Sequence, residues 1–428
     1  MAALPFSAPL RTPKYICGTC RTRLRSFRTP AIVTHQTFSS ASSSNRQIIH
    51  RPTSQQHLRK RVDTHPAKNG SLYRFPRTRE YSTTGPAPLP VTSGFAPLPH
   101  RRLISLSGPD AAKFLQGLIT NNVDLNQPKP FYAAFLNAQG RVLWDVFVWV
   151  WPELLAEEKQ WTCYIEVDER EAEELKKHLK RHKLRSKVEI EDISGDEVCV
   201  WAAWGSAADA RVNANDTMVD MQDPRAPNFH RYLAYADVKA LVPGTEPLSV
   251  TEYQIERYRY GIAEGPDEIP REDALPMEYN FDLWHGIDFK KGCYVGQELT
   301  IRTKHTGVVR KRVLPITLQL HPLAEPVEKI IVESGSEIKT IDDTQIGLKR
   351  GRARGKFIAN VGDVGLALCR LEQMTSMVID GSVHARTPEM RFACYTHDRD
   401  VVEVQPVLHD WFLEREKELW DKYGLRGL

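Results

Sequence analysis

The pattern of apolar and polar positions changes near residue 100. Before it, apolar residues show no sustained periodicity; after it, they recur at the spacings of strands and helices. Apolar and aromatic runs predict strands at 103–106, 131–136, 142–150, 161–167, 188–193 and 198–204. Helical spacing predicts helices from Pro109 to about 120, then at 168–182, 251–263 and 410–423. The order of these elements indicates an α+β fold.

The elements divide the chain into two folded parts. Residues 100–305 are expected to form one α+β domain, with a subdomain at about 160–245. The segment 137–140 separates two apolar runs and predicts a hairpin turn, whereas 206–228 has the composition of a loop. Short apolar runs punctuated by glycines predict a small β-barrel within 306–428, with a loop-rich insertion at 320–350 and a terminal helix.

Charge separates the first residues from the rest. Residues 1–90 hold 15 Lys and Arg but two acids, although the whole chain carries a net charge of only +4. An Arg-, Ser- and Thr-rich, acid-poor start is typical of a mitochondrial transit peptide, here 1–81, with cleavage near Ser82 and a disordered linker at 82–99. The alternative is a basic tail that binds nucleic acid or membranes. No apolar run is long enough to span a bilayer.

The cysteines indicate a reducing compartment rather than a disulfide framework. The chain has seven of them, an odd number, scattered along its length. Cys17 and Cys20 form a C-x-x-C pair, but a structural zinc site needs a second pair of ligands, and none follows at the usual spacing.

The segment from Lys290 to Arg312 contains the strongest candidate site. Cys293 lies close to two glycines, which allow a tight turn and close approach of a ligand or partner. Nearby Lys and Arg residues favour the reactive thiolate. Because four ligands are normal for an iron–sulfur cluster, a lone thiolate could only share one with a partner. The residues assigned to this motif are Lys291, Gly292, Cys293, Tyr294, Gly296, Gln297, Glu298 and Arg302.

Three other patterns are weaker. His178 and His182 are four residues apart on a helix, but lysines surround them, so a solvated helix face is expected. The run 351–356 resembles a phosphate-binding loop only superficially. Together with Arg310, Lys311 and Arg312 it could form a basic patch for an acidic protein, a polyanion or RNA, or an ordinary solvated strand edge.

Several motifs together resemble a known family. The segment 291–298 with Arg302 is similar to the signature of the YgfZ-type branch of the folate-binding glycine-cleavage T-protein superfamily. The similarity covers roughly residues 100–375. Its looser parts are the opening strand and helix at 106–117, the turn at 136–141, the Arg257-x-Arg259-x-Gly261 helix, Leu275-Pro276-x-Glu278 and the run 365–368.

The resemblance implies a T-protein-like folate-binding fold with a ferredoxin-like subdomain and a small C-terminal β-barrel. With a transit peptide, it implies a mitochondrial matrix factor for maturation of [4Fe–4S] proteins. Partners would be A-type carriers and clients such as aconitase-type and radical-SAM enzymes, lipoate and biotin synthases among them. An iron–sulfur cluster would be held only transiently, and tetrahydrofolate is a candidate cofactor. The folate-like pocket would comprise Asn137, Arg141, Asp145, Arg259 and Glu278.

One departure from the family separates the functional hypotheses. T-proteins carry paired acids on the strand after the turn, whereas Trp144 precedes the single acid Asp145 here. Assembly factor, rather than conventional enzyme, is therefore the leading hypothesis. The alternatives are a folate-dependent one-carbon transferase of the aminomethyl type and an RNA-modification factor that uses the basic patch around Arg352 and Arg354, although nucleic acid is not the expected partner.

Overall fold

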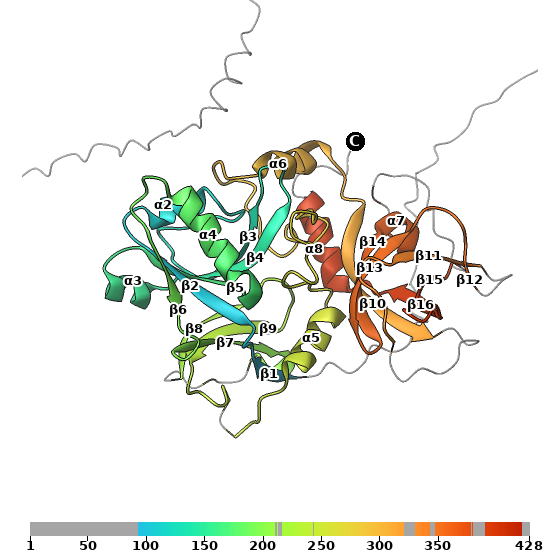
Figure 1. Cartoon of the computed structure of the whole chain (residues 1–428), viewed down its shortest axis with the longest axis horizontal. Helices are drawn as coiled ribbons and strands as arrows, with labels where there is room; N and C mark the ends of the chain where they lie inside the picture. Colours follow the sequence, from blue (N-terminus) through green and yellow to red (C-terminus); the bar gives the residue numbers. More distant parts are fainter. Residues whose placement is uncertain are drawn as a thin grey trace, which may run out of the picture. The chain divides into compact units, whose positions relative to one another are not determined.

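The computed structural model describes residues 93–209, 212, 216–242, 244–320, 330–342, 347–377, 379 and 390–421 (Figure 1). The expected transit peptide, Cys17, Cys20 and most of the expected linker lie outside the described residues. No described helix is both long and apolar enough to cross a membrane.

A five-stranded antiparallel sheet carries the first part of the fold. Its strand order is β3-β4-β5-β2-β6. The strands are β2 (Arg101–Ser107), β3 (Phe131–Leu136), β4 (Val142–Trp149), β5 (Thr162–Asp168) and β6 (Glu189–Ile193). Helices α2 (Ala111–Gln116) and α4 (Ala172–Lys183) pack their apolar residues on one face of it. The short helices α3 (Pro152–Glu158) and η1 (Glu169–Glu171) flank β5.

A second antiparallel sheet has the order β1-β7-β9-β8. Its strands are β1 (Gly94–Pro97), β7 (Val198–Trp204), β8 (Thr217–Gln222) and β9 (Phe229–Tyr235), and η2 (Gly205–Ala207) follows β7. The range 160–245, expected to be a ferredoxin-like subdomain, is thus shared between the two sheets. Two local predictions were wrong: the expected linker contains β1, and the expected loop 206–228 contains β8.

The inner faces of the two sheets contribute to one core. Phe147 and Trp149 from β4 share this core with Trp204 from β7 and with Tyr253 from helix α5 (Val250–Arg259). Ser249 caps α5 through a capping box with Glu252, which explains where this helix begins. The core therefore lies between strands that are far apart in the sequence.

The C-terminal part contains a closed ring of six strands. Strands β11, β13, β14, β10, β16 and β15 pair in that order, and the pairing of β11 with β15 closes the ring. Their bounds are β10 (Lys311–Leu320), β11 (Glu337–Asp342), β13 (Gly355–Val361), β14 (Val364–Arg370), β15 (Phe392–Tyr395) and β16 (Val401–Pro406). Strand β12 (Gly347–Leu348) pairs antiparallel with β11, and helix α7 (Leu371–Met374) follows β14. The expected small β-barrel is confirmed, and β11 lies within the expected loop-rich insertion.

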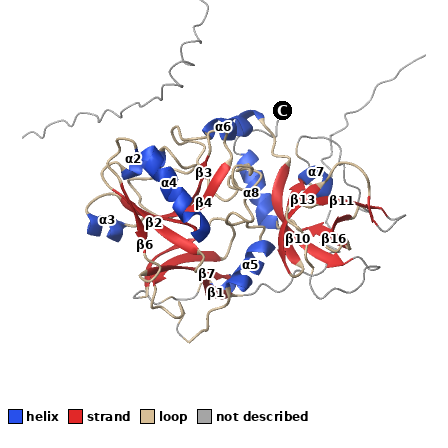
Figure 2. Cartoon of the chain, viewed as in Figure 1, coloured by secondary structure: helices blue, strands red, loops and turns tan. Residues whose placement is uncertain are grey.

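Two further helices complete the described fold (Figure 2). Helix α6 (Gln297–Thr306) directly follows the cysteine loop, and α8 (Asp410–Asp421) follows the barrel. Lys304 of α6 donates a hydrogen bond to the carbonyl oxygen of Leu419 in α8. His409 contacts the carbonyl oxygen of Arg259 at the end of α5, at 2.7 Å. The end of the described chain therefore contacts both α5 and α6.

Candidate functional site: the cysteine loop

Cys293 lies on a loop, residues 288–296, that leads into α6 and is itself exposed. Among the other described cysteines, Cys163, Cys369 and Cys394 are buried and Cys199 is half-buried. Burial raises the pKa of the Cys163 and Cys369 thiols far above the ordinary value. Of the described thiols, Cys293 is therefore the one that a partner protein can reach.

Lys291 fastens the loop to the end of α2 and to the segment that follows it. Its ammonium donates hydrogen bonds to the carbonyl oxygens of Gln116, Ile119 and Asn121, at 2.9, 2.7 and 2.6 Å. The carbonyl group of Gln116 at the end of α2 lacks a partner within the helix, and an ammonium has three donors to offer to it and to the two carbonyl groups beyond the helix. Burial lowers the pKa of Lys291 to about 7. Lys291 thus directs its charge into the fold and holds the loop in place.

Gly296 fastens the other end of the loop to the hairpin between β3 and β4. Its φ of +80° lies in the left-handed region, and a Cβ there would come within 2.3 Å of the Asn137 carbonyl oxygen. Across the contact, a Cβ on Gly140 would lie 2.9 Å from the Gly296 carbonyl oxygen. The hairpin predicted at 137–140 and the cysteine segment are therefore in direct backbone contact.

Hydrogen bonds within the loop fix its shape between these two anchors. The Tyr294 backbone N–H donates to Oε1 of Gln297 at 3.2 Å, and the Val295 N–H donates to the Gly117 carbonyl oxygen. The Tyr294 ring is buried beneath the Lys291 ammonium, which lies 5.0 Å from the ring centroid. The loop is held on both sides of Cys293.

The remaining motif residues face outward or are partly exposed. Glu298 and Arg302 are exposed on α6, and Glu298 lies in the first turn, where a negative charge favours the helix. A Cβ added to Gly292 would meet nothing within 4 Å. The fold therefore does not need a glycine at position 292, and open space lies next to this position, which adjoins Cys293.

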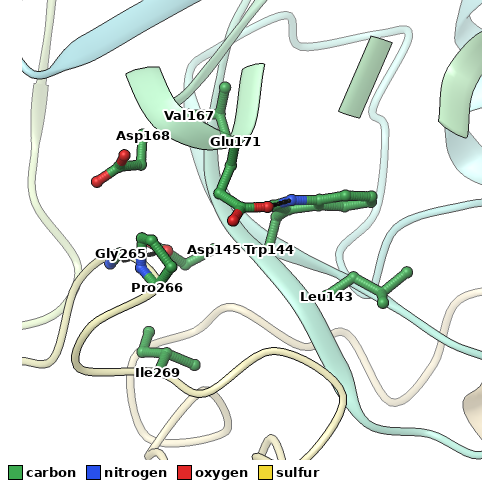
Figure 3. A pocket seen from close by; sticks show the side chains of 9 residues that line it. All are labelled: Leu143, Trp144, Asp145, Val167, Asp168, Glu171, Gly265, Pro266 and Ile269. Carbon is green, nitrogen blue, oxygen red and sulfur yellow. Dashed lines mark hydrogen bonds between the residues drawn. The ribbon is translucent and has the colours of Figure 1, made fainter. Parts of the chain in front are cut away.

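Asp145 lies on β4, where its carboxylate is buried (Figure 3). Its Oδ1 accepts a hydrogen bond from the Gly265 N–H at 3.0 Å, and its Oδ2 is 3.7 Å from the Arg101 guanidinium. Burial raises the pKa of Asp145, although Arg101 opposes the rise. The pocket beside it has a cavity volume of about 10 Å³ and is lined by Leu143, Trp144, Asp145, Val167, Asp168, Glu171, Gly265, Pro266 and Ile269.

The structure does not gather the other expected pocket residues around Asp145. Asn137 caps its own turn by accepting from the Arg141 N–H, and the Arg141 guanidinium donates to the Asp273 carbonyl oxygen. Arg259 pairs with Glu256 within α5, and Glu278 pairs with Lys311 at the start of β10. Of the five expected residues, Asp145 alone lines this pocket.

A buried ionic network, which the sequence did not predict, lies between the two sheets. Glu166 of β5 accepts hydrogen bonds from Arg101 of β2 at 2.8 Å, from Arg231 of β9 at 2.6 Å and from the Trp149 indole at 3.0 Å. Although burial opposes ionisation, Arg231 and Arg101 hold the pKa of Glu166 below its usual range. The sequence signal that could have revealed this network is Glu166, a charged residue within an apolar strand.

A second carboxylate extends this network. Glu264 accepts hydrogen bonds from Arg225 at 2.8 Å and from the Tyr253 hydroxyl at 3.1 Å. Burial opposes its ionisation, yet the guanidinium groups of Arg231 and Arg225 keep the pKa of Glu264 well below its usual range. The network joins β2, β5, β9, α5 and the segment after α5.

Two arginines of this network pack against Phe147, and this packing bears on whether a folate can bind. The Arg225 guanidinium lies 4.8 Å from the Phe147 ring centroid, and that of Arg231 lies 4.3 Å from it. The fully buried Phe147 ring is thus packed against the protein's own arginines and is not available for stacking by a flat ligand. The pocket beside Asp145 is also smaller than the roughly 300–1,000 Å³ of ligand sites. This pocket therefore does not fit a bound tetrahydrofolate.

The histidine pair differs from its predicted role. His178 is buried and packs edge-on against Trp144, and burial lowers its pKa to about 4. The expectation of a solvated face was wrong for His178, because this side of α4 faces the core. The described residues contain no group of three His, Cys, Asp or Glu side chains that could hold a metal ion.

The expected basic patch is smaller than predicted. Arg312 is fully buried and forms a two-pronged ion pair with Asp282, with both N–O distances at 2.8 Å. Arg310 and Arg352 remain exposed. Arg312 therefore belongs to the core, where it ties β10 to the segment before the cysteine loop.

This chain is similar in sequence to known domain families and to named proteins. Residues 94–241 match the GCVT N-terminal domain, and residues 310–412 match the CAF17 C-terminal beta-barrel domain. A protein of Phaeosphaeria nodorum named iron-sulfur cluster assembly factor IBA57 homolog, mitochondrial, is 48% identical over 86% of this chain and 92% of its own length. Proteins of the same name from Pyricularia oryzae and Aspergillus fumigatus are 47% and 40% identical over 68% and 71% of this chain, and 75% and 76% of their own lengths.

The fold also resembles a solved structure. Glycine cleavage system aminomethyltransferase T from Bartonella henselae superposes with a TM-score of 0.51, covering 76% of this chain and 87% of that protein, at 13% identity. At this identity the likeness concerns the fold alone. The sequence similarities go further: this chain belongs to the family of mitochondrial iron–sulfur cluster assembly factors named IBA57.

Proposed function

We propose that this protein is a mitochondrial matrix factor for the maturation of [4Fe–4S] proteins and that the Cys293 loop is its working site. The observation that carries the proposal is the exposed thiol on a loop held by Lys291 on one side and Gly296 on the other. A held loop presents its thiol in one geometry, which favours productive contact with a partner.

The cluster is the cargo of this site. Because the described residues offer no multi-ligand metal site, Cys293 would supply one thiolate and a partner would supply the remaining ligands. A-type carriers are the proposed partners, and aconitase-type and radical-SAM enzymes are the proposed clients. The open space beside Gly292 gives such a partner room to approach the thiol.

The decisive experiment replaces the thiol in cells that lack the endogenous protein. Cys293→Ala is expected to abolish recovery of aconitase activity and protein lipoylation, whereas Cys199→Ala, the matched control at a half-buried cysteine, is expected to restore both. Anaerobic co-purification with an A-type carrier, with iron and sulfide assayed in both variants, tests the shared cluster directly. Full recovery with Cys293→Ala would remove the thiol from the proposal.

A further inference from the structure

Leu184, between α4 and β6, combines two unfavourable features. Its side chain is 89% exposed, and its backbone has a φ of 44°. With its ψ of −107°, this conformation lies outside the left-handed helical region and is one that glycine adopts readily but residues with a Cβ rarely adopt. Glycine would relieve the strain and remove apolar surface from water, so the fold itself gives no reason for a leucine here.

Uncompensated positive charge surrounds this leucine. Lys180, Lys183, Arg185 and Lys187 form no ion pair with any residue that the structure describes. Earlier in the same helix the charges are balanced, since Lys176 pairs with Glu173 and Asp192, and Lys177 pairs with Glu174. We call Leu184 and these four cations the Leu184 surface.

An open groove of about 760 Å³ runs beside this surface, between α2 and the segment after α4. Phe114 and Lys113 of α2 line one side, and Leu184 and Arg185 line the other. Asp110 also lines the groove, but its Oδ2 accepts a hydrogen bond from the Lys187 backbone N–H at 2.8 Å. The groove is therefore lined by the exposed Leu184, the largely buried Phe114 and the cations Lys113 and Arg185, and the one acid in its lining faces a backbone N–H.

We propose that the Leu184 surface docks the protein on an anionic phospholipid bilayer. Leu184 would enter the acyl boundary while the cations contact the headgroup phosphates, an arrangement that matches the two attractions of peripheral membrane binding. A protein partner fits less well, because a stable protein interface needs a broad, largely charge-free centre, whereas a single apolar side chain stands among cations here. This role is independent of the thiol at Cys293.

The test is vesicle flotation of the full chain at about 0.1 M salt. Vesicles of phosphatidylcholine with about 30% phosphatidylglycerol are compared with vesicles of phosphatidylcholine alone. Leu184→Gly is expected to lower the affinity for anionic vesicles about tenfold. The double variant Lys183→Glu/Arg185→Glu is expected to lower it at least as much. The basic residues 1–90 contribute equally to every variant, so differences between variants report the Leu184 surface.

Two controls separate docking from folding. Leu184→Gly is expected to unfold at the wild-type temperature or higher, because glycine relieves the backbone strain. Leu125→Gly removes another exposed leucine, which is 65% exposed and follows the acidic Asp124, and is expected to leave vesicle binding unchanged. Equal binding of wild type to neutral and anionic vesicles would overturn the proposal. So would unchanged vesicle binding in both surface variants; if Leu184→Gly then also lost aconitase recovery in cells, the occupant would be an acidic protein instead.

Discussion

At the scale of single residues, two glycines of the cysteine loop have opposite requirements. Gly296 needs its left-handed backbone and close contact with Asn137, whereas Gly292 has open space around it. Gly296→Ala is expected to destabilise the protein by about 2 kcal/mol or more, because strain and overlap add. Gly292→Ala is expected to change the free energy of unfolding by less than about 0.5 kcal/mol.

Urea unfolding of the two glycine variants, side by side, checks this contrast. Equal stabilities would mean that the loop is not held at Gly296. Gly292→Ala has a second use, since it narrows the space beside the thiol without disturbing the fold. If a partner approaches there, this variant is expected to recover less aconitase activity than wild type in cells.

His178 is expected to make stability depend on pH. Burial lowers its pKa to about 4, below the unfolded value, so the unfolded chain binds more protons between these two values. Stability is therefore lost as pH falls from about 6.5 towards 4. His178→Phe is expected to lose about 1 kcal/mol less than wild type between pH 7.5 and 5.5, measured by urea unfolding. Parallel losses in the two proteins would contradict a buried neutral imidazole.

At the scale of elements, the cysteine loop depends on a contact with α2. Lys291→Met keeps the aliphatic stem but leaves three carbonyl oxygens without their donor. We expect a loss of about 1–3 kcal/mol in stability and faster amide exchange in residues 288–296. Lys290→Met, at the adjacent exposed position, is the matched control and should behave as wild type.

The strands show which elements can be predicted from the sequence and which cannot. Strands β3 and β7 were predicted with the bounds they have, because long apolar runs mark buried strands. Strands β1, β8 and β9 were missed. Strand β1 is four residues long with Gly and Pro, β8 is an edge strand of mixed polarity, and the apolar residues of β9 are interrupted by His230 and Arg231. Strand β1 pairs with β7, which is distant in the sequence, and local patterns carry no information about such a pairing.

The candidate site also has one part that the sequence reveals and another that it does not. The motif around Cys293 is contiguous, so sequence alone could identify it. The network of Arg101, Glu166 and Arg231 comes from three strands in two sheets and exists only after they meet. Likewise, the expected pocket residues other than Asp145 were assigned by resemblance. Asn137 and Arg259 have partners within their own turn and helix, whereas Arg141 and Glu278 contact residues farther along the chain.

At the scale of the whole molecule, the buried network joins the two sheets. Glu166→Gln removes the charge that compensates Arg101 and Arg231 and is expected to destabilise the protein by about 3–5 kcal/mol. Glu169→Gln, which breaks the exposed pair with Arg102, should cost less than about 1 kcal/mol. Thermal and urea unfolding test both. Similar losses in the two variants would show that the buried network does not hold the sheets together.

Lowering the pH is expected to weaken the same buried network. Because the pKa values of Glu166 and Glu264 are held low in the folded state, their contribution is present above the unfolded carboxyl pKa and is lost as pH falls below it. A reduced acid sensitivity of Glu166→Gln relative to wild type would support this origin.

The contact between α6 and α8 has a consequence for how the protein is made. Lys304, on the helix that follows Cys293, hydrogen-bonds to Leu419, more than a hundred positions later. A chain that emerges from a ribosome or an import channel with its N-terminus first exposes the cysteine loop long before α8 is delivered. The thiol thus acquires its final surroundings only when the barrel and α8 have arrived, so a chain cut short before α8 would present its cysteine on an unfinished scaffold.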